Sequence, residues 1–177
     1  MPRRRGMLAL ACTALLGACA TPASRPGDAT LPVLEGRLAL RVDGQPERDL
    51  SASFELSGSA EQGLLVLSGP LGATAAQARW TPAGAWLRSP QGEQPFATLD
   101  ALAEHSLGEA FPIAALFDWL RGRPWPGAAH AGRSDGVAGF EQLGWQVSLA
   151  RLAEGWLEAR RPGPPAVTVR VRLTPAS

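Results

Sequence analysis

One serine in the sequence stands in a pattern that could support covalent catalysis. Residues 132–136 read Gly-Arg-Ser-Asp-Gly and match G-x-S-x-G, the nucleophile elbow of hydrolases. The elbow needs a buried strand before the serine, a helix after it and a histidine later in the chain. Here proline and glycine fill the preceding segment, and both histidines, His105 and His130, come before Ser134. The pattern therefore indicates a polar loop, and a lipid-anchored hydrolase that uses Ser134 is kept only as an alternative.

The other residues suited to catalysis or metal binding lack the necessary spacing. The two histidines and two cysteines form none of the short motifs that bind zinc. Asp100 and Glu104 are one helical turn apart, which is typical of a solvated helix face. The sequence also has no glycine-rich phosphate loop. We therefore expect no catalytic residue, no metal and no cofactor, and a role in binding or carriage.

The N-terminal residues have the composition of a bacterial export signal. Arg3–Arg5 precede an apolar stretch of 11 residues, Gly6–Leu16, which is too short to cross a bilayer core of about 30 Å. The stretch ends in Leu-Gly-Ala-Cys19, which resembles the lipobox of bacterial lipoproteins, in which the cysteine is acylated. We expect residues 1–18 to be the signal peptide and Cys19 to carry the lipid anchor. A plain secretory signal with an incidental cysteine is the alternative.

The residues after Cys19 predict the membrane that the lipid anchor enters and the linker and domain that are attached to it. In the lipoprotein sorting of Gram-negative bacteria, an aspartate in the next position retains the protein at the inner membrane. Ala20 stands there instead, which predicts export to the periplasmic face of the outer membrane. Residues 19–33 are rich in Pro, Ser, Thr and Gly, which favours a flexible linker. Residues 34–177 have the length of a single domain.

The charge of the chain argues against a nucleic-acid partner, and its hydrophobic content indicates a folded domain. The chain has 17 basic residues, all arginine, against 16 acidic ones, and without Arg3–Arg5 the 14 remaining arginines leave a formal charge of −2. Nucleic-acid binding is not expected, because phosphate recognition needs clustered positive charge. Hydrophobic residues make up 45% of the chain, enough for a folded core. We expect the folded protein to be a monomer.

Period-two alternation of apolar and polar residues predicts half-buried strands through most of the domain. The clearest strands are 36–42, 49–56, 145–150 and 166–173; 63–68 is more continuously apolar, and 73–80, 85–88 and 155–160 are weaker candidates. Helical spacing marks 98–107, with Thr98 as N-cap, and 112–121, with Pro112 at the first position and Gly122 as the stop. This order predicts an open barrel or strongly curved sheet covered by two helices. Its interior could be solid or hollow.

Several motifs resemble one family along nearly the whole chain. In order they are the lipobox, Gly36-Arg37-Leu38, Ser53-Phe54, Leu67-Ser68-Gly69-Pro70-Leu71-Gly72, the helix from Phe111-Pro112-Ile113 to Asp118-Trp119-Leu120-Arg121-Gly122, Phe140-Glu141-Gln142-Leu143-Gly144-Trp145-Gln146-Val147, and the basic strand Val167–Leu173. Together they resemble LolB, the outer-membrane receptor that inserts lipoproteins. Two features depart from the family pattern: Glu55-Leu56 after the Ser-Phe pair, and the ending Thr174-Pro175-Ala176-Ser177.

The resemblance implies a fold and a function. The fold is mainly β with α: an incomplete antiparallel β-barrel with a short helical lid over a hydrophobic cavity. The function is to accept lipoproteins from the periplasmic carrier LolA and insert them into the lipid of the outer membrane, with their acyl chains held in the cavity. The alternative is a lipid-anchored assembly or structural lipoprotein without a ligand cavity.

The resemblance also assigns residues to two sites. Pro70, Leu71 and Gly72 would form a membrane-insertion loop, with Leu71 at the tip of a turn. Apart from the resemblance, we expect Trp119 and Trp125 near the mouth of the cavity, because an amphipathic ring suits a boundary between water and apolar surroundings. The candidate cavity residues are the inward strand faces (Leu38, Leu40, Val42, Phe54, Leu56, Val147, Leu149) and the lid (Leu99, Leu102, Ile113, Leu116, Phe117, Leu120).

Overall fold

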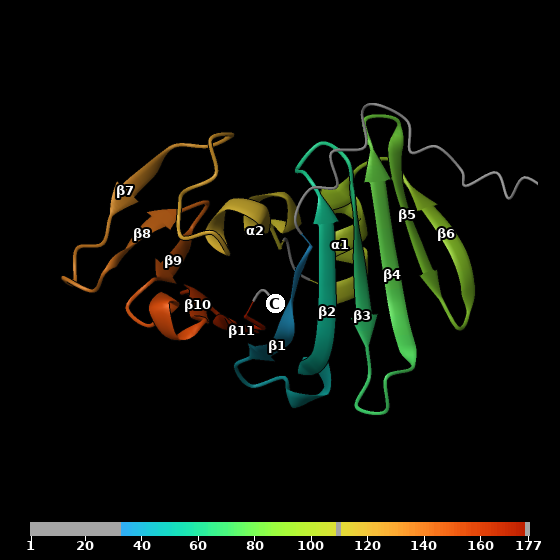
Figure 1. The fold of residues 1–177 in the computed structure, drawn as a ribbon, viewed down its shortest axis with the longest axis horizontal. Coiled ribbons are helices and arrows are strands. Elements are labelled where there is room, and N and C mark those ends of the chain that lie inside the picture. Colours follow the sequence, from blue (N-terminus) through green and yellow to red (C-terminus); the bar gives the residue numbers. More distant parts are fainter. Residues whose placement is uncertain (1–32, 109–110, 176–177) are drawn as a thin grey trace, which may run out of the picture.

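A computed structural model describes residues 33–108 and 111–175, and these residues form one curved antiparallel sheet with two short α-helices (Figure 1). The sheet has eleven strands in the order β6-β5-β4-β3-β2-β1-β11-β10-β9-β8-β7. The strands are β1 (Leu34–Val42), β2 (Leu50–Gly58), β3 (Gly63–Ser68), β4 (Thr74–Thr81), β5 (Gly84–Ser89), β6 (Gly92–Phe96), β7 (His130–Gly132), β8 (Gly139–Gln142), β9 (Trp145–Ser148), β10 (Trp156–Arg161) and β11 (Val167–Leu173).

The sheet consists of two meanders joined by the pairing of β1 with β11. Strands β1–β6 form the N-terminal half and β7–β11 the C-terminal half, and β6 and β7 are the two outer strands of the open sheet. Strands β2–β5 run vertically in Figure 1 and are seen at full length, whereas β10 and β11 are foreshortened there, so the sheet is strongly curved. Gly36 allows a close approach at the join, because a Cβ at this position would lie 2.1 Å from the carbonyl oxygen of Arg172. The predicted incomplete barrel is thus confirmed.

Alternation in the sequence matches the two faces of the sheet. In β1, Leu38, Leu40 and Val42 face the interior and stand opposite Val171, Val169 and Val167 of β11. Arginines and serines occupy the outward positions, as period-two alternation predicts. β3 has the predicted bounds, but its outward residues Leu64 and Val66 are partly exposed, so its continuous apolar run does not mean that both faces are covered.

The sequence did not predict three strands, β6, β7 and β8. β6 and β7 are the outer strands and are almost wholly exposed, so neither shows an apolar face. In β8 the inward positions are Phe140 and Gln142, and a glutamine at an inward position breaks the apolar alternation. All three strands are set by pairing with their neighbours rather than by their own hydrophobic pattern.

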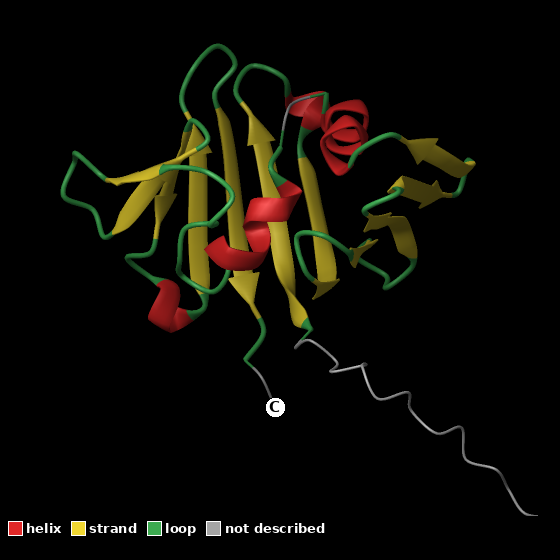
Figure 2. Cartoon of the chain, turned by 90° about the horizontal axis from the view of Figure 1, so that it is seen from above, coloured by secondary structure: helices red, strands yellow, loops and turns green. Residues whose placement is uncertain are grey.

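Two helices form the lid, α1 (Leu99–Leu107) and α2 (Ile113–Trp119), and Figure 2 shows helices lying over one face of the sheet. Thr98 is the N-cap of α1 as predicted, and its hydroxyl accepts a hydrogen bond from the amide of Ala101 at 3.1 Å. Gly108 ends α1 in the left-handed conformation. α2 is shorter than predicted, since it begins after Pro112 and ends at Trp119. Two 3₁₀ turns, η1 (Pro46–Arg48) and η2 (Leu152–Glu154), complete the described elements.

Candidate functional site

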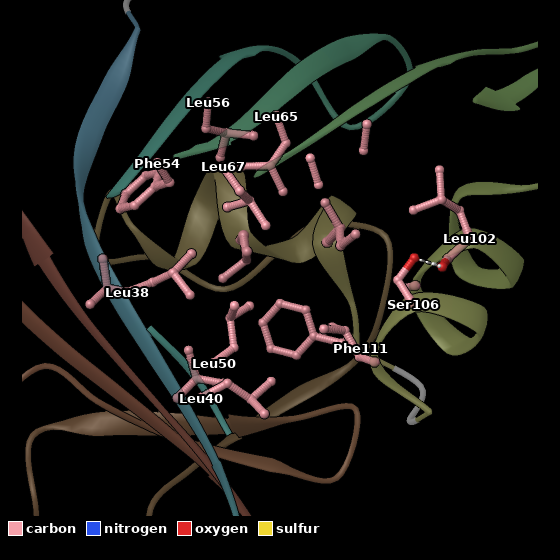
Figure 3. Close-up of a pocket in the computed structure, with 18 of the residues that line it drawn as sticks. Leu38, Leu40, Leu50, Phe54, Leu56, Leu65, Leu67, Leu102, Ser106 and Phe111 are labelled. Carbon is pink, nitrogen blue, oxygen red and sulfur yellow. Dashed lines mark hydrogen bonds between the residues drawn. The ribbon is translucent and has the colours of Figure 1, made fainter. Parts of the chain in front are cut away.

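An apolar cavity lies between the lid and strands β1–β5 and β11 of the sheet (Figure 3). Its volume is about 100 Å³. The lining residues are Leu38, Leu40, Leu50, Phe54, Leu56, Leu65, Leu67, Ala76, Ala78, Leu87, Leu102, Ala103, Ser106, Leu107, Phe111, Ile113, Leu116, Leu120, Val169 and Val171. They come from β1–β5, β11, both helices and the segment between the helices.

The cavity has almost no capacity for hydrogen bonding. Ser106 is the one polar residue in its lining, and the Ser106 hydroxyl donates a hydrogen bond to the carbonyl oxygen of Leu102 at 2.8 Å (Figure 3). No charged side chain lines the cavity. Such a cavity can bind a hydrocarbon through apolar burial, at about 0.8 kcal/mol for each CH₂ group, and offers no group for acid–base or nucleophilic chemistry.

Eight of the predicted cavity residues belong to the lining: Leu38, Leu40, Phe54, Leu56, Leu102, Ile113, Leu116 and Leu120. The other five lie elsewhere: Val42, Phe117 and Val147 are buried core residues, and Leu99 and Leu149 pack at its margin. Phe117 packs against Trp80, with ring centroids 5.8 Å apart. Whether the lining holds acyl chains stays a prediction.

Aromatic rings fill the part of the interior that lies over β8 and β9. Trp145 contacts Phe111 and Trp119 at centroid distances of 5.4 and 6.3 Å, and Trp119 also contacts Phe140. These rings occupy the space over β8 and β9, so Val147 faces packed core. The interior is therefore solid over β8 and β9 and hollow between β1–β5, β11 and the lid.

Alternation could have identified most of the lining residues that the prediction missed. Leu65 and Leu67 are two apart in β3, and Ala76 and Ala78 are two apart in β4. Leu50 lies on the same face of β2 as Phe54. The small side chains of Ala76, Ala78 and Ala103 help to leave the cavity empty, but residue size by itself does not reveal which alanines border a void.

The side-chain amide of Gln142 links α2, β8 and the loop after α2 in the closely packed part of the interior. The side chain of Gln142, which is 2% exposed, makes four hydrogen bonds. Its Oε1 accepts from Trp119 Nε1 at 2.8 Å and from the amide of Trp125 at 2.9 Å. Its Nε2 donates to the carbonyl oxygens of Trp125 and Ala128 at 2.7 and 2.8 Å. Trp119 is fully buried among aromatic rings and is not part of the cavity lining, so its expected place near the cavity mouth was wrong.

The predicted turn at the end of β3 is present. The amide of Gly72 donates to the carbonyl oxygen of Gly69 at 3.0 Å, which places Pro70 and Leu71 at the two central positions. Leu71 is 97% exposed, the most exposed of the large hydrophobic residues described. In Figure 1 the turn between β3 and β4 projects from one end of the sheet.

Ser134 lies in a loop between two strands, β7 and β8, rather than between a strand and a helix. The Arg133 guanidinium, which donates to Asp135, and the amide of Val137 lower the pKa of the Asp135 carboxyl to about 2. Both histidines contact aromatic rings: His105 lies against Phe96 and His130 against Phe140. Among the described residues, no cluster of His, Cys, Asp and Glu has the arrangement of a metal site.

The predicted signal peptide, Cys19 and nearly all of the linker lie outside the described residues. Within residues 33–108 and 111–175, neither helix is long and apolar enough to cross a bilayer.

Comparison with known proteins places the chain in one family. The model of the family "Outer membrane lipoprotein LolB" matches residues 33–174. The outer-membrane lipoprotein LolB of Bordetella pertussis is 37% identical over 152 residues, 78% of this chain and 75% of the relative. That of Cupriavidus pinatubonensis is 33% identical over 176 residues, 92% of this chain and 83% of the relative. With its half-barrel, helical lid and apolar cavity, the chain belongs to the LolB family of outer-membrane lipoproteins.

Proposed function

We propose that this protein accepts lipoproteins from a LolA-like periplasmic carrier and inserts them into the outer membrane. The acyl chains of the cargo enter the cavity beneath the lid and then pass into the bilayer. The observation that carries the proposal is the apolar lining, in which one hydroxyl is already satisfied internally. Each step transfers hydrocarbon between apolar surroundings, so the process needs no covalent intermediate and no nucleotide.

The proposal includes the N-terminal region and the turn at Leu71. Residues 1–18 are removed, and acylated Cys19 anchors the domain of residues 34–177 to the periplasmic face of the outer membrane through the linker of residues 19–33. Several acyl chains on one residue give stable anchoring. Leu71 contacts the acyl region of the bilayer and promotes release of the cargo. The protein acts as a monomer.

Binding of an acylated peptide tests the cavity directly. The mature chain with Cys19→Ser carries no acyl groups of its own and can be titrated without detergent with a fluorescent acylated peptide. We expect saturable binding that an unlabelled acylated peptide displaces and the same peptide without acyl groups does not. Binding that never saturates, or that the non-acylated peptide displaces equally well, would contradict the proposal.

A filled cavity should bind less well. Ala76→Phe places a ring in a cavity of about 100 Å³, and since about 150 Å³ holds one benzene, we expect affinity to fall about tenfold or more. Ala39→Phe adds the same ring on the outward face of β1, opposite Arg170, and is the matched control. Circular dichroism checks that both variants fold. Equal affinity of the two variants would show that acyl chains bind elsewhere.

Depletion in cells tests the transport step. When the protein is depleted, lipoproteins should accumulate in the periplasm bound to their carrier, and the wild-type gene should restore their delivery. Normal delivery after depletion would favour the structural or assembly role instead.

A further inference from the structure

The cavity is too small for the proposed cargo in the structure described. The space accessible in it is about 100 Å³, whereas an apolar cavity of about 150 Å³ holds a single benzene ring. A fatty acyl chain is several times larger than a benzene ring. If the proposed function holds, the lid must therefore move to admit the acyl chain. The strands beneath it cannot easily move, because every strand except the outer β6 and β7 is paired on both sides.

The two helices of the lid differ in how firmly they are held. In α2, five of seven residues are buried, and the indole of Trp119 is hydrogen-bonded to Gln142 of β8. In α1, two of nine residues are buried, Leu102 and Ala103. Elements with little buried apolar surface open at a lower free-energy cost than well-buried elements. α1 is therefore the helix that can move while α2 stays in place.

Arg48 makes a long-range contact with the C-terminal end of α1, where His105 also packs against Phe96 of β6. Arg48 lies in η1, the connection between β1 and β2, and its Nη2 donates to the carbonyl oxygen of Leu107 at 2.5 Å. Its Nη1 donates to Gln45 Oε1 at 2.8 Å, which orients the guanidinium. The guanidinium also lies against Gly108, where an added Cβ would be 2.6 Å from Nη2. A cation at a helix C-terminus stabilises the carbonyl oxygens that have no partner within the helix.

This contact lies beside the cavity. Leu107 and Ser106, in the last turn of α1, belong to the lining, and so does Leu50, two residues after Arg48. Movement of this end of α1 away from η1 would separate Leu107 from Leu50 and enlarge the cavity between them. The same movement requires the hydrogen bond from Arg48 to Leu107 to break.

We propose that Arg48 is a positioning residue that holds α1 closed over the cavity, and that acyl chains enter when this end of α1 moves away from η1. The proposal rests on the proposed function for its ligand and on the described contacts for its geometry. Arg48 touches no cargo in this mechanism. It sets the fraction of molecules in which the cavity is open, and so the rate at which acyl chains enter.

Arg48→Ala tests the proposal, with Arg121→Ala as the matched control. Arg121 Nη1 also donates to a helix carbonyl oxygen, that of Phe117 in α2, at 2.6 Å. Both substitutions therefore remove a hydrogen bond from arginine to a helix carbonyl oxygen, but only Arg48→Ala removes one that joins α1 to another element. Both are made in the mature Cys19→Ser chain, with Arg48→Lys as a variant that keeps a cationic donor.

Two measurements separate positioning from a general loss of stability. In hydrogen–deuterium exchange without ligand, Arg48→Ala should speed exchange of the α1 amides about tenfold and leave α2 unchanged, because a hydrogen bond to a charged group has about this effect on an opening equilibrium. In stopped-flow mixing with the fluorescent acylated peptide, entry should be faster by a similar factor. Arg48→Lys should restore much of the wild-type behaviour, and Arg121→Ala should change neither α1 exchange nor entry.

The outcomes distinguish this proposal from the proposed function. Unchanged α1 exchange in Arg48→Ala, or an equal effect of Arg121→Ala on α1, overturns the role of Arg48. Saturable binding with an entry rate unaffected by Arg48→Ala also overturns that role and leaves the proposed function standing. Absence of acyl binding in the wild-type chain and all variants overturns the proposed function instead.

Discussion

Two leucines at hairpin tips, Leu71 and Leu143, differ in how much of the side chain is exposed. Leu71 is 97% exposed in the turn between β3 and β4, and Leu143 is 46% exposed in the two-residue turn between β8 and β9. Leu143 also has φ = 54°, a left-handed backbone that disfavours side chains other than Asn and Asp. Single exposed leucines are ordinary on protein surfaces. Leu71 is notable because nearly all of its side chain is available to a membrane.

Leu71→Glu should block delivery and leave binding intact. Burying a leucine side chain in acyl chains contributes about 1.5–3 kcal/mol, so we expect transfer of bound cargo to liposomes to slow at least about tenfold. The turn itself should persist, because the hydrogen bond from Gly72 to Gly69 involves only backbone atoms.

Leu143→Glu is the control for this change, since it introduces the same charge at another exposed hairpin tip. It should deliver cargo at the wild-type rate. Transfer by Leu71→Glu at that rate, with acyl binding preserved, would remove Leu71 from the mechanism.

At the scale of elements, the structure divides the lid into a fixed and a movable helix. α2 is held to β8 by one buried glutamine, which also fixes the loop at Trp125 and Ala128. In α1, the Thr98 hydroxyl caps the first turn and Arg48 of η1 donates to the last turn. Buried polar groups stabilise a fold only when all their hydrogen bonds are made. The four bonds of Gln142 meet this condition, which explains how a polar side chain occupies an inward strand position.

Gln142→Leu should therefore destabilise the protein strongly. The substitution leaves the buried Trp119 indole and the partly buried backbone groups of Trp125 and Ala128 without their partner. A buried unpaired group costs about 1–3 kcal/mol, and the partly buried groups add a smaller cost. We expect the free energy of unfolding, measured by urea titration, to fall by about 3 kcal/mol or more.

Gln146→Leu makes the same chemical change on the neighbouring strand β9, where the side chain has one long hydrogen bond of 3.4 Å to Glu141. It should alter the free energy of unfolding by less than about 0.5 kcal/mol. Similar losses in both variants would mean that the Gln142 network does not carry the stability assigned to it.

At the scale of the whole molecule, acidic side chains are stabilised in their charged form around the surface. Within residues 33–108 and 111–175, four carboxyls have a pKa below the ordinary value. Asp49 accepts from Arg41 and the amide of Val42, Glu61 from the Ser59 hydroxyl, Asp135 from Arg133 and the amide of Val137, and Glu154 from Arg151. A carboxyl with a lowered pKa binds fewer protons in the folded than in the unfolded chain, so its contribution to stability is present above its unfolded pKa and is lost as the pH falls.

We therefore expect the free energy of unfolding to decline in acid. For Asp135 the contribution should be complete above about pH 5 and be lost between about pH 4 and 2, since its pKa is lowered from 3.8 to about 2. Asp135→Asn should lower stability at pH 7 and reduce the difference between pH 7 and pH 2. Urea titrations at these two pH values measure the change. An unchanged difference would show that the carboxylate gains nothing from Arg133 in the folded state.

The amino-acid sequence by itself determined the features that depend on neighbouring residues. Alternation located β1–β5 and β9–β11, because one face of each strand is buried and the other is solvated. The Thr98 cap and the turn at Pro70–Gly72 followed from short-range chemistry in the same way. Eight cavity residues were found because they share the inward faces with the core.

Only the tertiary structure decided which part of the interior is hollow. Whether a void remains depends on the volumes of side chains from distant elements, and the rings of Trp119 and Trp145 fill one part while alanines of β4 and α1 border the hollow part. The inward Gln142 and the contact between Arg48 and Leu107 likewise join residues 17 to 59 positions apart. No local pattern encodes such contacts, because each partner is chosen by how the sheet curves and where the helices lie on it.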